Sequence, residues 1–165
     1  MTEMKIVDGI HLKKAGIFDM DKLYSFVYSW LDEKKYYYHE GLYKKKGDEL
    51  ELEMGGFRKV TDYAKYQIDI TFHLWSMVDV EMIKHGKKVK MTKAWMDITI
   101  TGKLVTDYEG RWSKSKFLES LNKFYENYII KRTIEDEWAV GVYKEAYDLH
   151  EKMKAIMEQE ASRNG

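Results

Sequence analysis

Cysteine and proline are both absent from this chain of 165 residues, and its basic and acidic residues are equal in number. Without cysteine there is no disulfide framework, thiolate metal site or cysteine nucleophile, and nothing indicates an oxidising compartment. Without proline there are no proline-rich linkers or polyproline ligand segments. The 28 basic and 28 acidic residues cancel, so no overall field attracts nucleic acid or an anionic membrane.

Long apolar runs are also missing. No stretch approaches the roughly 18 consecutive apolar residues of a membrane-spanning helix, and the amino-terminal segment lacks the apolar core of a signal peptide. We therefore expect a cytoplasmic protein without membrane contact. The length fits a single domain over residues 1–165, which can bury a core without disulfide or metal cross-links.

The clearest pattern is a pair of runs, Tyr66 to Met82 and Ala94 to Leu104, in which the even positions are mainly apolar. This period of two is typical of half-buried strands, and Gly86 between the runs indicates an antiparallel hairpin. Even positions oppose even positions only across a three-residue loop, His85-Gly86-Lys87, or with a bulge. The three-residue loop predicts these buried pairs: Leu74 with Ile98, Phe72 with Ile100, and Ile68 with Leu104.

Shorter patterns define the other strands and the first helix. Residues 5–14 alternate as a strand, and Asp19 is placed to cap an amphipathic helix of about four turns. The tyrosine-rich segment 35–46 leads into Gly47-Asp48, which is typical of a two-residue hairpin turn before another strand. Gly55-Gly56 interrupts that strand, and apolar residues resume on the opposite parity, which predicts a bulge.

Helical periodicity dominates the carboxy-terminal third. Ser115 is placed to cap a helix whose apolar stripe runs from Phe117 to Tyr128. Thr133 followed by Asp136 resembles a capping box and predicts a joint near 131–133, with one continuous helix as the alternative. The last helix carries these residues along one face: Trp138, Val142, Ala146, Leu149, Met153 and Ile156.

A length argument selects the architecture. Laid flat, the run 66–82 would span roughly 56 Å at about 3.3 Å per residue, whereas a globule of this size is about 40 Å across. The strand must coil, bulge or protrude, and the last helix, roughly 43 Å long, can fill the concave face. We predict an α+β fold: a curved antiparallel β-meander with one amino-terminal helix and long carboxy-terminal helices packed on it.

The order strand, helix, antiparallel meander and long carboxy-terminal helix resembles the helix-grip fold of the START-like superfamily. The resemblance covers most of the chain and consists of element order, without a family motif. The chain differs in having one helix between its first two strands and a pair of helices at its end. The resemblance implies an apolar or amphipathic small molecule held between sheet and helices. A plain α+β sandwich, with helices on one face of a meander, is the alternative.

Aromatic side chains provide the candidates for such a ligand site. If Gly47-Asp48 forms a two-residue turn, Tyr37 and Tyr43 face inward, where aromatic walls with polar tips suit a pocket. Phe72 on the apolar face of the main hairpin and Trp138 on the last helix complete the predicted ligand-binding set. An edge strand beside an ordinary core is the alternative interpretation of these tyrosines.

Two surface features favour macromolecular partners instead. Trp75, Met77 and Trp95 lie on the otherwise polar face of the main hairpin, with Met77 predicted opposite Trp95, and an exposed aromatic patch favours self-association. Cover by another part of the chain is the alternative. A meander also brings both lysine-rich turns to one end of the sheet, which predicts a basic rim for nucleic-acid phosphates. The rim contains Lys44, Lys45, Lys46, Lys84, Lys87 and Lys88, and lysines that only keep hairpin tips soluble are the alternative.

Catalytic chemistry has no signature here. His73 shares its strand face with Asp69 and Asp97, a grouping that suits a metal or a proton-transferring imidazole, with a solvated strand face as the alternative. The glutamates at 49, 51 and 53 alternate with leucines, as on the wet side of a strand. We predict a non-enzymatic binding domain without catalytic residues, metal or cofactor; the ligand, the oligomeric state and the biological process stay open.

Overall fold

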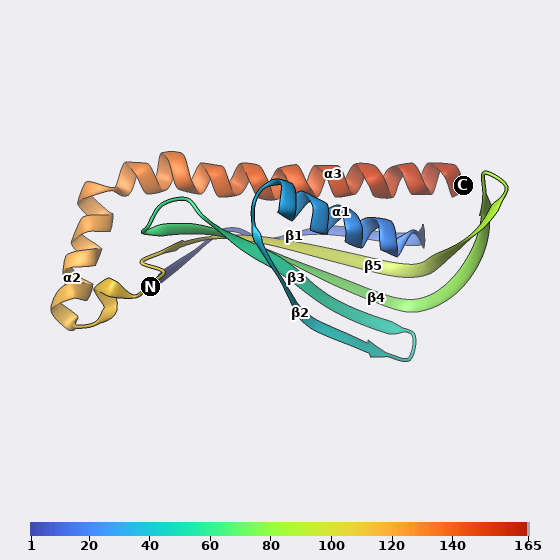
Figure 1. Ribbon diagram of the computed structural model, residues 1–165, viewed down its shortest axis with the longest axis horizontal. Helices are drawn as coiled ribbons and strands as arrows, with labels where there is room; N and C mark the ends of the chain where they lie inside the picture. The colour runs from blue at the N-terminus through green and yellow to red at the C-terminus, as the bar shows by residue number, and fades with distance from the viewer. Residues whose placement is uncertain (165) are drawn as a thin grey trace.

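The computed structural model describes the backbone of residues 1–164 and the side chains of residues 1–159. Its body is one five-stranded antiparallel sheet in the order β1-β5-β4-β3-β2, with helices along one side (Figure 1). The main elements are β1 (Thr2–Phe18), α1 (Met20–Glu33), β2 (Tyr37–Lys46), β3 (Glu49–Lys59), β4 (Ala64–Lys84), β5 (Lys87–Thr106), α2 (Lys116–Phe124) and α3 (Val140–Asn164). The predicted α+β class and the meander are confirmed.

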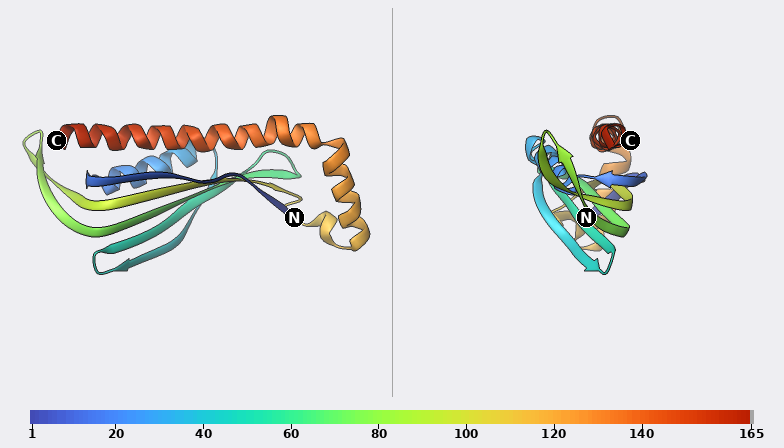
Figure 2. Two further views of the ribbon diagram at one scale, coloured as in Figure 1. Left: turned by 180° about the vertical axis from the view of Figure 1, so that it is seen from behind. Right: turned by 90° about the vertical axis from the view of Figure 1, so that its right-hand side faces the viewer.

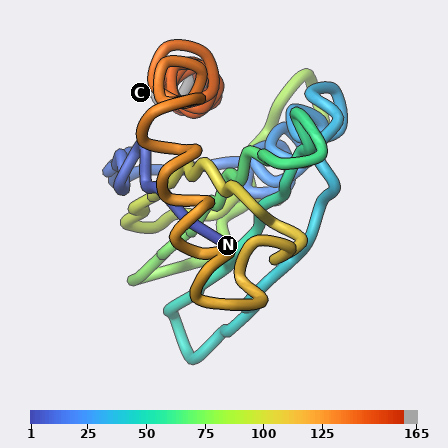
Figure 3. The backbone as a smooth tube through the Cα atoms, turned by 90° about the vertical axis from the view of Figure 1, so that its left-hand side faces the viewer, coloured from blue at the N-terminus to red at the C-terminus, as the bar shows by residue number. Residues whose placement is uncertain are grey.

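The sheet coils strongly, as the strand lengths require. Its concave side holds α1 and α3, and the β4–β5 hairpin curls upward past the rest of the sheet (Figures 1 and 2). Seen from the end, α2 descends from α3 past the edge of the sheet (Figure 3). Among the described residues, no helix combines the length and the apolar character needed to cross a membrane.

One core lies between the concave face and the helices. The even-numbered apolar residues of β4 and β5 point into it, and apolar stripes of α1 and α3 close it. Its most deeply buried members include Leu23, Val27, Leu31, Ile68, Ile70, Phe72, Leu74, Met96, Ile98, Ile100, Leu104, Val142, Ala146, Leu149 and Met153. Burial of these large side chains supplies the main driving force for folding.

Local signals at the helix ends are confirmed in part. The Asp19 carboxylate accepts from the backbone N–H of Lys22 at 3.1 Å, and the Ser115 hydroxyl accepts from that of Leu118 at 3.2 Å. The chain bends between α2 and α3 near the predicted joint (Figure 1). The capping box at Thr133 is wrong, because helical bonding is already established there: the Ile134 N–H donates to the Ile130 carbonyl at 2.9 Å.

In the main hairpin a bulge, and not a three-residue loop, lets the even-numbered residues of both strands face the core. Lys84 pairs with Lys87 around a two-residue turn in which His85 and Gly86 both have positive φ. Between the pairs Trp75–Trp95 and Val78–Lys93, β4 has two residues where β5 has one. The predicted pairs are therefore wrong by two positions: Leu74 lies opposite Met96, Phe72 opposite Ile98, and Tyr66 opposite Leu104.

No bulge exists at Gly55-Gly56, where β3 pairs with β4 without a break in register. Close approach of neighbouring backbones explains these glycines instead. A Cβ on Gly55 would lie 2.5 Å from the Ile68 carbonyl oxygen, and one on Gly56 would lie 2.8 Å from that of Tyr37. Only glycine therefore fits this crossing of β2, β3 and β4.

Candidate functional site

The convex face of the sheet is open to solvent. Helices α1 and α3 occupy the concave side, and within residues 1–164 no helix lies against the opposite side (Figure 2). Odd-numbered residues of β4 before the bulge point there, together with the odd-numbered residues of β5 from Lys93 to Lys103. Three features on this face are candidates for function: an apolar depression, a polar groove and a cluster of one histidine with two glutamates.

The apolar depression has a volume of about 620 Å³ and lies between β1, β4 and β5, near the base of the protruding hairpin. We call it the Trp95 depression. Its lining consists of Ala15, Gly16, Ser76, Val78, Val80, Lys93, Ala94 and Trp95. Trp95 keeps 56% of its surface exposed, as does Val78, so this apolar surface faces solvent.

The β4 bulge builds the Trp95 depression. Ser76 adopts φ +54°, a left-handed conformation, and the extra residue brings Val78 to the same face as Trp95. Met77 turns to the other side, where it packs against the core while its N–H donates to the Asp48 carbonyl at 2.9 Å. The predicted Met77–Trp95 neighbour pair is therefore wrong, and Trp75 is the residue directly opposite Trp95.

Among the residues that the structure describes, Lys93 is the one charged residue in this lining. It lies between Val78 of β4 and Ile17 of β1 in the strand registers. No carboxylate of the part of the chain that the structure describes forms an ion pair with it. The depression thus combines an exposed indole, an apolar floor and one unpaired cation.

A polar groove of about 390 Å³ lies further along the convex face, centred on Asp69. Asp69 Oδ2 accepts from the Gln67 amide at 3.0 Å and lies 3.8 Å from Lys103 Nζ. Its Oδ1 is 4.0 Å from His39 Nε2. Because the charged groups of this groove largely satisfy one another, it offers no concentrated charge to a ligand.

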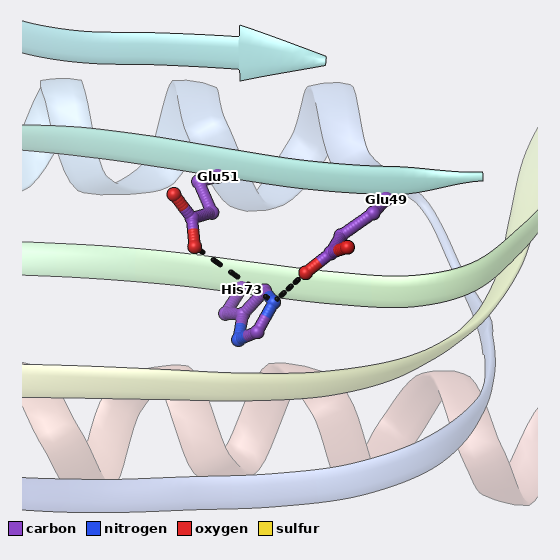
Figure 4. Close-up of side chains that lie close together, drawn as sticks. All are labelled: Glu49, Glu51 and His73. Atoms are coloured by element: carbon purple, nitrogen blue, oxygen red, sulfur yellow. Dashed lines mark hydrogen bonds and ion pairs between the residues drawn. The ribbon is translucent and has the colours of Figure 1, made fainter. Parts of the chain in front are cut away.

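Glu49, Glu51 and His73 form a third cluster on this face (Figure 4). The β3–β4 register places Glu51 directly opposite His73. His73 Nε2 lies 2.7 Å from Glu49 Oε1 and 4.0 Å from Glu51 Oε1. The sequence predicted only Asp69 and Asp97 as acidic neighbours of His73, so these two glutamates were missed.

Asp97 has a different histidine as its partner. Its Oδ1 lies 2.9 Å from His11 Nδ1, and the Thr99 hydroxyl is 3.2 Å from the same nitrogen. Strand β1 brings His11 to this position by pairing with β5. With the 4.0 Å contact between His39 and Asp69, the described residues of the convex face form three separate histidine–carboxylate groups and not a single one.

A polar network also lies on the concave side, at the meeting point of α1, β3 and α3. Arg58 Nη2 is 2.5 Å from Glu145 Oε1, and its Nη1 donates to the Lys34 carbonyl at 2.9 Å. The Tyr36 hydroxyl donates to the other oxygen of Glu145. Burial, followed by the negative charge of Glu145, raises the pKa of Tyr36 well above its usual range. These groups link elements of the fold and leave little surface for a ligand.

The predicted ligand-binding residues do not line one site. Tyr37 and Tyr43 lie on the edge strand β2 with 66% and 61% of their surfaces exposed, so their predicted inward orientation is wrong. A register shift between Glu40 and Tyr43 displaces this strand from the simple alternation assumed for it. Phe72 is fully buried in the core, and Trp138 is half-buried before the start of α3.

The lysine clusters share one end of the sheet but do not form a rim. The Gly47-Asp48 turn lies level with Met77, as the hydrogen bond to Asp48 shows. The β4–β5 hairpin runs on from there to Lys84, roughly 20 Å at about 3.3 Å per residue, and curls away (Figure 1). Lys44, Lys45 and Lys46 are thereby separated from Lys84, Lys87 and Lys88. Nucleic-acid binding stays a prediction, without the continuous basic surface that motivated it.

Fold and surface together define an open α+β fold with several surface sites on the convex face of its sheet. The chain matches no protein-family model, no curated protein and no solved structure at a significant level. Its function is therefore argued from its own geometry.

Proposed function

We propose that this chain is a binding domain and that the Trp95 depression takes an amphipathic small molecule with an acidic head group. The observation that carries the proposal is the coincidence of an exposed indole, an apolar hollow and an unpaired lysine. The apolar part of the ligand would lie on Trp95 and Val78. Its acidic group would pair with Lys93.

The dimensions of the depression suit this class of ligand. Its volume of about 620 Å³ falls within the range of about 300–1,000 Å³ that is typical of small-molecule sites. Each buried methylene contributes about 0.8 kcal/mol, so a ten-carbon chain buried over half of its surface contributes roughly 4 kcal/mol. An exposed ion pair adds up to about 1 kcal/mol. A total of roughly 5 kcal/mol sets the tightest dissociation constant to expect at about 0.2 mM, because the entropy lost on association opposes binding.

The location differs from the one that the START-like resemblance implies, and that resemblance stays a prediction. Between sheet and helices, the large side chains of Phe72, Leu74 and Met96 are fully buried against their neighbours. A ligand on that side would have to displace packed core residues, which costs several kcal/mol of packing energy. Binding at the Trp95 depression requires no such displacement.

The test is a titration with decanoate and with the uncharged glycerol monoester of the same acid. The indole N–H signals of the five tryptophans in a proton–nitrogen NMR spectrum report where each ligand binds. We expect decanoate to shift the Trp95 signal, identified by its loss in Trp95→Phe, and to bind about fivefold more tightly than the monoester. An unmoved Trp95 signal at 5 mM decanoate would refute the proposal.

Two variants and one control sharpen this test. Trp95→Gln should abolish binding, and Lys93→Gln should remove the preference for decanoate over the monoester. Lys88→Gln changes an equivalent charge on the same strand, outside the depression, and should bind as the unaltered chain does. Equal effects of the Lys93 and Lys88 substitutions would show that only net charge matters.

Self-association is a second candidate, favoured by the outer surface of α2 and the turn after it. The apolar stripe predicted there exists, but it faces solvent instead of the core. Its exposed members are Phe117, Leu121, Phe124, Tyr128 and Ile129. Clustered exposed aromatic groups are typical of protein interfaces. Sedimentation of the chain and of a Phe124→Ser variant tests this: a monomer at millimolar concentration would exclude the interface.

A further inference from the structure

The cluster of Glu49, Glu51 and His73 has the composition and spacing of a metal site. Each residue offers one ligand atom, and the three atoms lie within 4.8 Å of one another (Figure 4). The side chains are about half exposed, so an ion can reach them and keep water ligands. This group lies on β3 and β4, outside the lining of the Trp95 depression.

The backbone holds these ligands in fixed relative positions. Glu49 and Glu51 are alternate residues of β3 and project to the same side, while Leu50 between them is anchored in the core. His73 lies on the neighbouring strand, directly opposite Glu51, beside the fully buried Leu74. Only side-chain rotations are therefore needed to bring the three ligand atoms to one ion.

The distances from His73 Nε2 to the two glutamate oxygens lie on either side of the separation that a bound ion requires. Zinc bonds to nitrogen and carboxylate oxygen at about 2.0–2.2 Å, so adjacent ligand atoms in a tetrahedral site lie roughly 3.3–3.5 Å apart. His73 Nε2 is 2.7 Å from Glu49 Oε1 and 4.0 Å from Glu51 Oε1. One contact must lengthen and the other shorten by less than about 1 Å each, which exposed glutamate side chains can do by changing rotamer.

We propose that Glu49, Glu51 and His73 bind a divalent transition-metal ion, with Zn²⁺ as the best match. One imidazole and two carboxylates suit Zn²⁺, Co²⁺ and Ni²⁺ better than Mg²⁺ or Ca²⁺, which prefer oxygen ligands alone. Three protein ligands leave at least one coordination position to water.

Nearby charges limit the affinity. The β2–β3 register places Lys44 opposite Glu51 and Lys46 opposite Glu49, so two cations flank the carboxylates. Asp97 lies across from His73 on β5, but His11 engages it at 2.9 Å. We expect a dissociation constant in the micromolar range. Neutralising the lysines should tighten binding, because fewer positive charges then oppose the ion.

Trp75 provides a built-in reporter. Its ring centroid lies 4.9 Å from that of His73. Ni²⁺ bound at His73 should quench Trp75 fluorescence, and Zn²⁺, which does not quench, should restore it by competition. In Trp75→Phe the quenching disappears, while isothermal titration calorimetry still detects the ion.

The experiment compares matched variants of the whole chain by calorimetry with Zn²⁺ at pH 7.5. His73→Gln and Glu49→Gln should weaken binding at least tenfold, whereas Glu53→Gln, on the same face of β3 but outside the cluster, should change it less than twofold. Lys46→Gln should strengthen binding two- to fivefold. No heat at 1 mM Zn²⁺, or equal binding by the Glu49 and Glu53 variants, would overturn the proposal. Circular dichroism confirms that each variant is folded.

Discussion

Replacing Arg58 with methionine should destabilise the fold, because Arg58 links three elements at one point. Its guanidinium lies 2.5 Å from Glu145 of α3 and donates to the Lys34 carbonyl at the end of α1. It also lies over the rings of Tyr36 and Tyr66, at 5.1 and 5.3 Å from their centroids. Methionine keeps the apolar stem and removes every one of these polar contacts.

The magnitude follows from the burial of the ion pair. The side chains of Arg58 and Glu145 are only 27% and 16% exposed. Breaking a fully buried pair costs about 3–5 kcal/mol, and the partial exposure here reduces the expected loss to about 2–3 kcal/mol. The Glu145 carboxylate then keeps the Tyr36 hydroxyl as its donor. For a domain of this length, the melting temperature should fall by about 4–12 °C.

Urea unfolding followed by circular dichroism measures this loss in a double-mutant cycle. Arg58→Met should cost about 2–3 kcal/mol in the unaltered chain and less than about 1 kcal/mol when Glu145→Gln is already present. Arg111→Met is the matched control, since Arg111 pairs with Glu109 but is 71% exposed, and should cost no more than about 0.5 kcal/mol. The same cost in both backgrounds, or a loss as small as that of the control, would refute the proposed link.

Three further predictions concern backbone packing and pH. Gly55→Ala should cost at least about 2 kcal/mol in urea unfolding, because its Cβ would meet the Ile68 carbonyl oxygen at 2.5 Å; a neutral effect would contradict this. The Trp30 indole donates to Asp148 at 3.0 Å and lowers the pKa of Asp148, so this stabilisation holds above about pH 4 and disappears as the pH falls further; Asp148→Asn should flatten the acid side of a stability–pH curve. Burial raises the pKa of Tyr36, so the contribution of Tyr36 to stability is complete below about pH 10 and declines as the pH rises further. Absorbance at 295 nm should show tyrosine side chains that ionise only when the protein unfolds, and Tyr36→Phe should have fewer of them.

Local signals in the sequence predicted elements well because their causes are local. Asp19 and Ser115 cap helices by accepting a hydrogen bond from a backbone N–H three residues away. Gly47-Asp48 forms a two-residue turn between the paired residues Lys46 and Glu49. The alternation of apolar and polar residues along each strand likewise indicates which side chains face the core. None of these inferences needs knowledge of a distant part of the chain.

Register could not be predicted because the residue that sets it carries no mark in the sequence. Ser76 adopts a positive φ, a conformation usually found at glycine or asparagine, so a serine here does not indicate a bulge. The extra residue in β4 changes the partner on β5 of every residue from Ala64 to Trp75. It also turns the Met77 side chain from the convex face toward the core. The cluster around His73 was missed for a similar reason, since Glu51 meets it only through the β3–β4 register.

The same bulge bears on where function lies. A serine in the left-handed region costs about 1 kcal/mol or more, and the bulge interrupts the hydrogen-bond ladder of the two longest strands. Packing of the core does not require Val78 beside Trp95, because both side chains stay more than half exposed. A sheet shaped by stability alone would bury these groups or replace them with polar ones, as most of the convex face does around Asp69 and His73. The costly bulge and the exposed apolar surface occur together at one place, and that coincidence favours the Trp95 depression over the closed core as the place for the proposed ligand.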